Sequence, residues 1–512
     1  MKHTFFKSLL LLTAGVYMLA GSSCKKLEDF DDTNDNPSGS STPITSALLT
    51  NAEVGLGGIV SGVTTGGNKA GLYAQFFSET QYTDASLYAE PKLDMGGTYS
   101  GPLIDLQVIV NKNTDPATAG TTLIQGAGSN ANQIAVATIL KAYIFWTLTD
   151  RWGDVPYSEA LKGAANLHPA FDKQEDIYLG IMQDLKDAVA GFDNGLWMQG
   201  DLFYNGDPAQ WKKVANTLRM QIALRTTKVY PAAGQWAETE FSAAFNDPAG
   251  YMTTNADNMV IHYPGGSFKN PYFTIYDGRT DYAFSKTIGD IMSNMNDDRK
   301  DAGYKSAGPD FPYGLTRDNA IAFGSYGKYL APAYRAEGSD VVVISASTSL
   351  LAAAEGVERW GLASPISAEQ LYNDGVTESF DQWGVGGAAA AYLAGDANYN
   401  GGSGGGSDIG ANAFGSIVGA NATTNTKLER IALQRYLASY PNGIEAWSEW
   451  RRTGIPHLTP TTAATNTSDG SQIPRRYVYA TAEYSLNPDQ VAAAVARLTG
   501  GDKMSSRMWW DQ

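Results

Sequence analysis

Few residues of the 512-residue chain have the types and spacing that catalysis or metal binding requires. Its four histidines are far apart, and none forms an HExxH pair or another spaced ligand cluster: His3, His168, His262 and His457. Cys24 is the only cysteine, which excludes internal disulfides, cysteine-rich zinc sites and thiol catalysis. We therefore expect structural roles for the histidines and no metal site. No motif among these residues supports an enzymatic function.

A glycine-rich segment offers two further motifs, and neither is complete. Gly401–Gly405 fits the G-x-S-x-G pattern of hydrolase nucleophiles, but that pattern needs a flanking strand and helix, and this segment has low complexity. Asp396–Gly401 matches the first half of a calcium loop, whose twelfth position should be glutamate and is Ser407. We expect no cofactor, and favour a plain glycine-rich turn over a structural calcium ion near Asp396.

Cys24 stands where the signal sequence of a bacterial lipoprotein would be cleaved. Two lysines precede an apolar stretch, Leu9–Ala20, which is too short to span a bilayer, and small residues lead from it to Cys24. This order predicts a signal peptide over residues 1–23 and acylation of the Cys24 thiol, although Gly21 stands where a leucine-like residue is usual. The alternative is an ordinary free cysteine near a cleavage site.

The residues after Cys24 are polar and acidic. Lys25–Asp32 and the polar run behind it predict a flexible, lipidated tether over residues 24–42. Acidic residues at this position resemble the surface-export signals of Bacteroidetes lipoproteins. Because each buried acyl CH₂ contributes about 0.8 kcal/mol, we expect stable lipid anchoring in the outer membrane, with the protein exposed at the cell surface.

Composition narrows the class of ligand. The net charge is −16 with a pI near 4.7, which disfavours nucleic acid, since binding phosphates requires clustered lysine and arginine. Tyrosine (28) and tryptophan (11) are abundant, whereas only 18% of residues are charged. This mixture suits neutral, hydroxyl-rich or peptide-like ligands, although the aromatic residues could equally fill the core.

Helical periodicity dominates wherever the pattern is clear. Gln133–Thr149 is apolar on nearly all sides, yet it is short for a membrane span and carries Lys141, so we predict a buried helix. Apolar spacing or capping motifs predict further helices at Ile177–Phe192, Asp207–Ile222, Ser367–Trp383 and Thr426–Leu433, and a helix pair over Ser347–Trp360. Paired helices of this length suit degenerate tetratricopeptide units, although no 34-residue consensus is visible.

Strand signals are few, and the connections between helices are long. Met259–Tyr263 and Val341–Ile344 are short β-branched runs that predict minor strands. Long polar or glycine-rich connections occur at 80–101, 113–130, 263–283, 300–334, 384–425 and 459–474. Connections of this length in a compact chain are usually functional or disordered.

Several segments match one family in order along the chain. Thr149–Tyr157, with the sequence TDRWGDVPY, is the most specific of them. The others are Asp31–Glu53, Ala137–Leu161, Ser285–Arg299, Gly443–Leu458 (which contains EAWSEWRRTGIP), Ile473–Asn487 and Met508–Asp511. The chain thus resembles the SusD/RagB family of nutrient-binding outer-membrane lipoproteins over nearly its whole length.

The resemblance implies both a fold and a partner. The fold would be mainly α, with about four degenerate tetratricopeptide-type hairpins packed against a loop-rich subdomain with minor β, as one domain over residues 43–512. The partner would be a TonB-dependent outer-membrane transporter of the SusC type, to which captured oligosaccharide is delivered. Some members of the family take peptides instead, and no catalysis is associated with it. A surface glycoside hydrolase is the remaining alternative.

Ligand contacts are expected on aromatic loops rather than in the family motifs. The Trp and Arg residues of those motifs lie on or beside predicted helices, so we interpret them as parts of the scaffold. Tyr and Trp rings beside Asn, Asp or Arg suit the apolar face and hydroxyl rim of a sugar. The residues that offer this mixture are Tyr82, Asp84, Tyr88, Tyr272, Phe273, Tyr276, Arg279, Tyr326 and Trp383. Packing within the core or loops is the alternative for each one.

Overall fold

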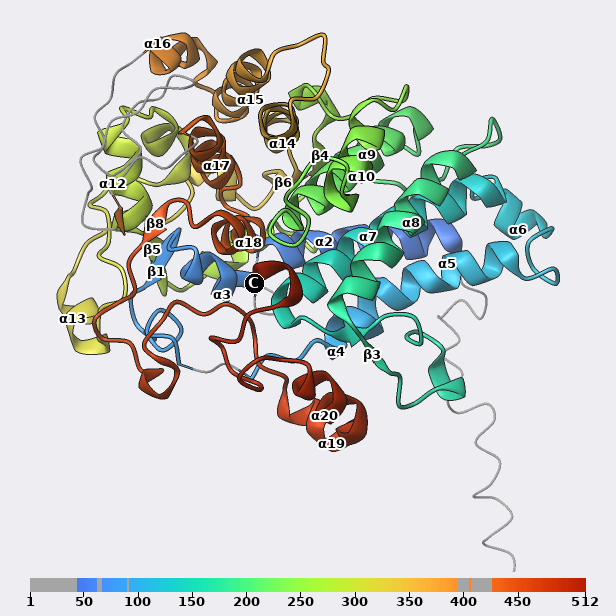
Figure 1. Cartoon of the computed structure of the whole chain (residues 1–512), viewed down its shortest axis with the longest axis horizontal. Coiled ribbons are helices and arrows are strands. Elements are labelled where there is room, and N and C mark those ends of the chain that lie inside the picture. The colour runs from blue at the N-terminus through green and yellow to red at the C-terminus, as the bar shows by residue number, and fades with distance from the viewer. Residues whose placement is uncertain (1–43, 62–66, 90–91, 395–404, 407–425) are drawn as a thin grey trace, which may run out of the picture. The chain divides into compact units, whose positions relative to one another are not determined.

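The fold is built mainly from α-helices that pack in pairs (Figure 1). The computed structural model describes residues 44–61, 67–89, 92–394, 405–406 and 426–512. The larger helices are α2 (Thr45–Ser61), α5 (Ile104–Thr114), α7 (Asn130–Trp152), α8 (Gln174–Gly191), α9 (Pro208–Arg225), α10 (Trp236–Phe245), α14 (Ala346–Trp360), α15 (Ala368–Gln382), α17 (Thr426–Ala438) and α18 (Gly443–Thr453). α7 packs with α8, α9 with α10, α14 with α15, and α17 with α18. The predicted mainly helical architecture is confirmed.

Helix α7 is buried on nearly all sides, as its apolar pattern predicted. The Ser129 hydroxyl caps its first turn by accepting a hydrogen bond from the Asn132 N–H at 3.2 Å. The helix ends at Gly153, whose φ of 86° lies in the left-handed region that glycine adopts without strain. Packing against α5, α8, α9 and α18 accounts for the missing polar face.

The capping motifs locate further helices correctly. The Asp207 carboxylate accepts a hydrogen bond from the Ala209 N–H at the start of α9, and Ser367 accepts one from the Gln370 N–H at the start of α15. The predicted helix pair over Ser347–Trp360 was wrong, because α14 is a single helix. Gly356 does not interrupt it; a Cβ there would lie 2.1 Å from the Phe241 ring, so this glycine permits a close helix contact.

Strands are short and form two-stranded antiparallel sheets. They are β1 (Phe77–Glu79) with β5 (Tyr282–Phe284), β2 (Val155–Pro156) with β3 (Phe171–Asp172), β4 (Met259–Ile261) with β6 (Val341–Ile344), and β7 (Gly405–Gly406) with β8 (His457–Leu458). Both strands predicted from β-branched runs are therefore confirmed, and they pair with each other as β4 and β6.

The long connections contain short helical elements. They are α3 (Gly67–Tyr73), α4 (Gly96–Thr98), η1 (Tyr99–Leu103), α6 (Thr122–Gln125), η2 (Gly163–Ala165), η3 (Asn255–Asp257), α11 (Pro271–Tyr276), α12 (Lys286–Asn294), η4 (Lys300–Tyr304), α13 (Arg317–Ala322), η5 (Pro332–Arg335), η6 (Gly386–Ala388), α16 (Ala389–Ala394), η7 (Thr467–Asp469), α19 (Thr481–Leu486), α20 (Pro488–Ala496) and η8 (Trp509–Asp511). Apart from α12 and α20, with nine residues each, these elements span three to seven residues, which is too short for apolar periodicity to reveal them.

A buried network of ion pairs joins α14, α17 and α18. The guanidinium of Arg452 binds both oxygens of Glu355, at 2.6 and 2.7 Å, and Glu449 at 2.6 Å. Arg435 contacts the same two carboxylates at 2.7 and 3.0 Å. Burial would raise the pKa of Glu449, but Arg435, Arg452 and Arg225 outweigh it and hold that pKa at about 2. The charges of this network are therefore mutually satisfied inside the fold.

The C-terminal segment packs against the same helices. The Arg451 guanidinium lies 3.7 Å from the centre of the Trp447 ring and donates to the backbone oxygen of Asp150 at 2.7 Å. The Trp447 indole N–H donates to the Pro474 carbonyl at 2.8 Å, and the Tyr477 N–H donates to the Arg151 carbonyl at 2.7 Å. Most Arg and Trp residues of the family motifs are thus buried in the scaffold, whereas Arg475 and Trp509 are half-buried.

Residues Thr45–Gln512 form one compact unit. The signal peptide and tether predicted over residues 1–42, with Cys24, lie outside the described residues, as does Asp396. None of the helices in the described part of the chain is both long enough and apolar enough to cross a membrane.

Candidate functional site

Strands β1 and β5 bring two of the predicted ligand loops side by side. Where the strands end, the Thr80 N–H donates to the Asp281 carbonyl at 2.8 Å, and the Thr80 hydroxyl donates to the Thr280 carbonyl at 2.5 Å. The Tyr326 hydroxyl donates to that same Thr280 carbonyl at 2.9 Å. Tyr326 therefore fixes the two loops to each other, and its ring packs against Phe311.

Tyr82 projects from the first of these loops. Its side chain is 59% exposed, the highest fraction of any tyrosine in the described residues. The guanidinium groups of Arg279 and Arg317 lie 6.0 and 5.7 Å from the centre of its ring. Arg279 also pairs with Asp281 at 2.5 Å. We call these three side chains, Tyr82, Arg279 and Arg317, the Tyr82 surface.

A buried carboxylate holds the loop that carries Tyr82. Glu79 accepts hydrogen bonds at 2.9 Å from the backbone N–H groups of Ala85 and Ser86, so the turn that follows Tyr82 is held at its start. Burial raises the pKa of Glu79, and Lys69 at 3.6 Å opposes that shift. The side chain of Asp84, two residues after Tyr82, is exposed beside this surface and adds acceptor oxygens.

Three other predicted aromatic residues are less accessible than Tyr82. Tyr88 is fully buried, and burial raises its pKa to about 12. Tyr276 is 8% exposed, donates its hydroxyl to the Tyr282 carbonyl, and has its pKa raised by burial. Phe273 is half-buried, with the ammonium of Lys269 5.2 Å from its ring centre. The packing alternative accounts for Tyr88 and Tyr276, which belong to the core.

Tyr272 and Trp383 line a cavity of about 440 Å³ between α11, η5 and strand β6. Tyr334, which the sequence did not single out, completes its aromatic wall, with its ring centre 4.8 Å from that of Trp383. Ser339, Asp340 and Gln382 supply the polar rim. Tyr272 and Trp383 are each only 4% exposed, so of the three rings Tyr334 alone is half-exposed to an occupant.

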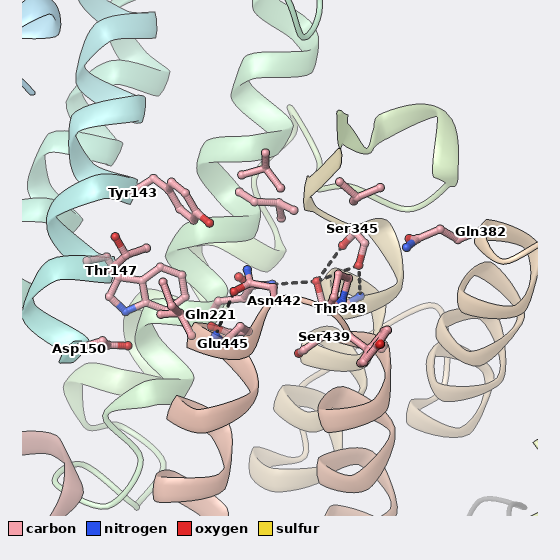
Figure 2. Close-up of a pocket in the computed structure, with 18 residues that line it drawn as sticks. Tyr143, Thr147, Asp150, Gln221, Ser345, Thr348, Gln382, Ser439, Asn442 and Glu445 are labelled. Carbon is pink, nitrogen blue, oxygen red and sulfur yellow. Dashed lines mark hydrogen bonds between the residues drawn. The ribbon is translucent and has the colours of Figure 1, made fainter. Parts of the chain in front are cut away.

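A second cavity lies deeper, among α7, α9, α14 and α18 (Figure 2). Figure 2 shows Tyr143, Asp150, Gln221, Ser345 and Glu445 around it. Its volume of about 50 Å³ holds on the order of four water molecules, at about 10–15 Å³ each. A sugar ring does not fit there, and we assign this cavity to solvent within the scaffold.

Arg317 and Tyr334 could not be recognised from the sequence. Both lie in the long connection over residues 300–334, where α13 and η5 are too short to show periodicity. Within the described residues, no group of three or more His, Cys, Asp or Glu side chains could hold a metal ion. The possible calcium site near Asp396 stays a prediction.

Comparison with known proteins gives a family. A family model described as "Starch-binding associating with outer membrane", the SusD-like model, matches residues 37–480. No curated protein matches the chain. Among solved structures, a chitin-binding protein is 27% identical with a TM-score of 0.70, covering 91% of this chain and 99% of that one.

Two further structures agree with this fold. A chitin-binding SusD homologue from Flavobacterium johnsoniae is 24% identical with a TM-score of 0.72, covering 92% of this chain and 97% of that one. A putative outer-membrane protein from Bacteroides vulgatus, described as probably involved in nutrient binding, is 25% identical with a TM-score of 0.71, covering 92% and 100%. Because the family model spans most of the sequence, the chain belongs to the SusD-like family.

Proposed function

We propose that this protein binds oligosaccharide at the cell surface, with the Tyr82 surface as its contact with the glycan. One observation carries the proposal: a tyrosine that is 59% exposed has two guanidinium groups within 6.0 Å of its ring centre, on loops held by hydrogen bonds. The ring offers an apolar face to sugar C–H groups, and the guanidinium groups donate to hydroxyls around it. Asp84 supplies carboxylate acceptors at the edge.

The Tyr82 surface fits a glycan chain better than the cavity at Trp383 does. An open surface lets a chain extend past the contact in both directions, whereas a cavity of about 440 Å³ accepts a chain end. Two of the three rings at the cavity are also 4% exposed and already packed. Rigid loops further favour binding, since little ordering entropy is lost on association.

Family membership supports the remaining parts of the proposal. The family model is described as starch-binding and outer-membrane-associated, and the solved relative at 27% identity is named a chitin-binding protein. We infer that the protein is anchored by acylation of Cys24, hands its oligosaccharide to a TonB-dependent transporter of the SusC type, and carries out no catalysis. These steps follow from the resemblance and from the signal sequence.

The binding test compares Tyr82→Ala with the unchanged chain on starch- and chitin-derived oligosaccharides, by isothermal titration calorimetry. We expect affinity to fall about tenfold, because removing a central aromatic contact costs on the order of 1–2 kcal/mol. Tyr82→Phe should retain most of the affinity, since it keeps the ring. The melting temperature should stay nearly unchanged in both variants, because the ring is exposed.

Tyr484→Ala is the matched control, since Tyr484 is also an exposed tyrosine, 42% accessible, on α19. It should leave affinity unchanged. Equal affinity in Tyr82→Ala and the unchanged chain would contradict the proposed surface. Binding of peptides instead of glycans would contradict the ligand class, and new products after incubation with either would contradict the absence of catalysis.

The anchor and the partner have their own tests. Cys24→Ser should abolish incorporation of labelled palmitate and release the protein from outer-membrane fractions. The lipidated chain should co-purify with a TonB-dependent transporter after mild detergent extraction. Retention of Cys24→Ser in the membrane fraction would show that anchoring does not depend on this thiol.

A further inference from the structure

A third cavity, lined mainly by polar side chains, lies among α5, α7 and α8, away from the Tyr82 surface. These helices occupy one side of Figure 1, and β1, β5 and α13 occupy the other. The pocket has a volume of about 450 Å³, within the range of about 300–1,000 Å³ of small-molecule sites. Its lining includes Gln107, Asn111, Lys141, Tyr157, Ser158 and Asp184.

Lys141 is the charged residue in the middle of the otherwise apolar α7. Its ammonium donates to the side-chain oxygen of Gln107 at 2.5 Å, and within the described residues it makes no ion pair. Burial lowers the pKa of Lys141, and Asp184 opposes that shift. This ammonium is partly desolvated, lines the cavity and makes one hydrogen bond within the described residues, so it can bind a further acceptor.

Asp184 faces the same pocket from α8. The Tyr157 hydroxyl donates to one of its carboxylate oxygens at 2.6 Å, and in the described part of the chain the other oxygen accepts no hydrogen bond. Burial raises the pKa of Asp184. Two opposite charges therefore face one cavity without forming an ion pair, so a bound group that accepts from Lys141 and donates to Asp184 would satisfy both.

Neutral polar groups outnumber the charged ones, which are Lys141, Asp184 and the exposed Lys162. Gln107 and Asn111 present amides, and Tyr157 and Ser158 present hydroxyls, so the wall alternates donors and acceptors. These groups already make hydrogen bonds of their own: Gln107 accepts from Lys141 and donates to Asn111, Tyr157 donates to Asp184, and Ser158 donates to Asp172. Each keeps part of its capacity for a ligand that both donates and accepts. A vicinal diol donates and accepts at each hydroxyl, so it pairs with charged and neutral groups alike, and the half-exposed Tyr157 ring adds an apolar face.

We propose that this pocket binds a single sugar residue, as a second site separate from the Tyr82 surface. The inference rests on the proposed function only in its choice of ligand class. A hydroxyl of the sugar would bridge Lys141 and Asp184, and the amides of Gln107 and Asn111 would fix its neighbours. The protein would then hold a chain at one surface and a monosaccharide or chain end at the other.

The test uses the full chain with D-glucose, D-mannose and N-acetyl-D-glucosamine as probes at millimolar concentration, followed by ligand-observed NMR titration. We expect at least one monosaccharide to bind, and Lys141→Met and Asp184→Asn each to weaken it about fivefold, on the order of 1 kcal/mol. Both replacements conserve side-chain length, so the fold should persist, and melting temperatures verify this. Asp176→Asn, exposed in the first turn of the same helix, is the control and should change nothing.

Three outcomes would overturn the inference. The first is that no monosaccharide binds, and the second is that monosaccharide binding survives both pocket substitutions. The third is that the zwitterion glycine binds in the pocket and the monosaccharides do not. The two sites are separable in the same experiment. If only Tyr82→Ala loses monosaccharide binding, the sugar binds at the Tyr82 surface and not in this pocket. If only Lys141→Met loses it, and Tyr82→Ala leaves oligosaccharide affinity unchanged, the pocket site is supported and the proposed Tyr82 contact is contradicted.

Discussion

The buried network at Arg452 and the Tyr82 surface use the same side-chain types in opposite environments. At the network, Arg452 and Arg435 meet Glu355 and Glu449 at 2.6–3.0 Å, and all four side chains are at most 2% exposed. At the Tyr82 surface, Arg279 pairs with Asp281 while its own side chain remains 59% exposed. Burial is the difference between the two regions, and it changes what each arginine can do.

An exposed guanidinium keeps its hydration and can exchange water for a ligand hydroxyl at little cost. A buried one has given up that hydration, so every partner it loses leaves an uncompensated charge. Arginine at the network therefore maintains the fold, whereas arginine at the Tyr82 surface is accessible for the binding that we propose. Substitutions should therefore range from a large loss of stability at the buried network to small losses of affinity at the exposed rings.

Arg452→Met should produce the largest change. It removes the bidentate partner of Glu355 and one partner of Glu449, which costs about 3–5 kcal/mol of unfolding free energy when an ion pair is buried. Urea denaturation followed by circular dichroism measures the loss. Arg279→Met is the matched control at an exposed pair and should change stability by less than about 1 kcal/mol. Similar losses in both would mean that burial does not govern the two roles.

Glu53 is a buried carboxylate that, unlike Glu449, forms no ion pair with an arginine within the described residues, so the pH dependence of stability should differ at the two residues. Glu53 of α2 accepts a hydrogen bond from the Leu202 N–H at 2.7 Å, and burial, reinforced by the nearby Asp201 charge, raises its pKa well above the usual value. Its protonated form therefore favours the folded state. This stabilisation is fully present below the unfolded pKa of 4.5 and is lost as pH rises through the folded pKa.

Glu53→Gln should remove that dependence. The amide stays neutral and still offers an oxygen to Leu202, so the variant should lose less stability than the unchanged chain between pH 5 and about pH 8. Melting temperatures across this interval test it. Glu449 behaves in the opposite sense, because its pKa of about 2 lies below the unfolded value of 4.5. Its ionised form therefore stabilises the fold, and this stabilisation is present above pH 4.5 and is lost on acidification. A parallel pH profile in Glu53→Gln and the unchanged chain would contradict the assignment.

The scaffold could be predicted from the sequence because its signals are local. The apolar run of α7 and the caps at Asp207 and Ser367 each depend on neighbouring residues, and the structure contains the predicted helices. The β4–β6 strands were recognisable for the same reason. The prediction of two helices over Ser347–Trp360 was wrong, since α14 is one helix; the close contact of Gly356 with Phe241 is tertiary and cannot be seen in the local sequence.

The candidate site could be predicted only in part. The sequence selected Tyr82 and Arg279, but it selected Tyr88 and Tyr276 by the same criterion, and the structure buries those two. Aromatic composition in a loop cannot reveal whether a ring faces solvent. Arg317 contacts Tyr82 from a connection that is distant in the sequence. Local sequence patterns do not reveal such a tertiary contact.

Arg317→Ala should weaken oligosaccharide binding modestly. A cation beside an exposed aromatic ring contributes about 0.5–1 kcal/mol, which corresponds to roughly two- to fivefold in affinity. Arg317→Lys keeps the charge and should recover part of the loss. The melting temperature should not move in either variant, because the side chain is exposed. A large fall in stability would place Arg317 with the buried arginines instead.

Tyr334→Ala is expected to have the smallest effect. Tyr334 is the half-exposed ring of the cavity at Trp383, and its removal opens that cavity without disturbing the Tyr82 surface. Oligosaccharide affinity should stay within about twofold, less than the change of roughly 1 kcal/mol expected of a central contact. Trp383→Ala is less informative, because that ring is buried against Tyr304 and its loss would destabilise the fold. A tenfold loss in Tyr334→Ala, with unchanged affinity in Tyr82→Ala, would move the glycan from the open surface into the cavity.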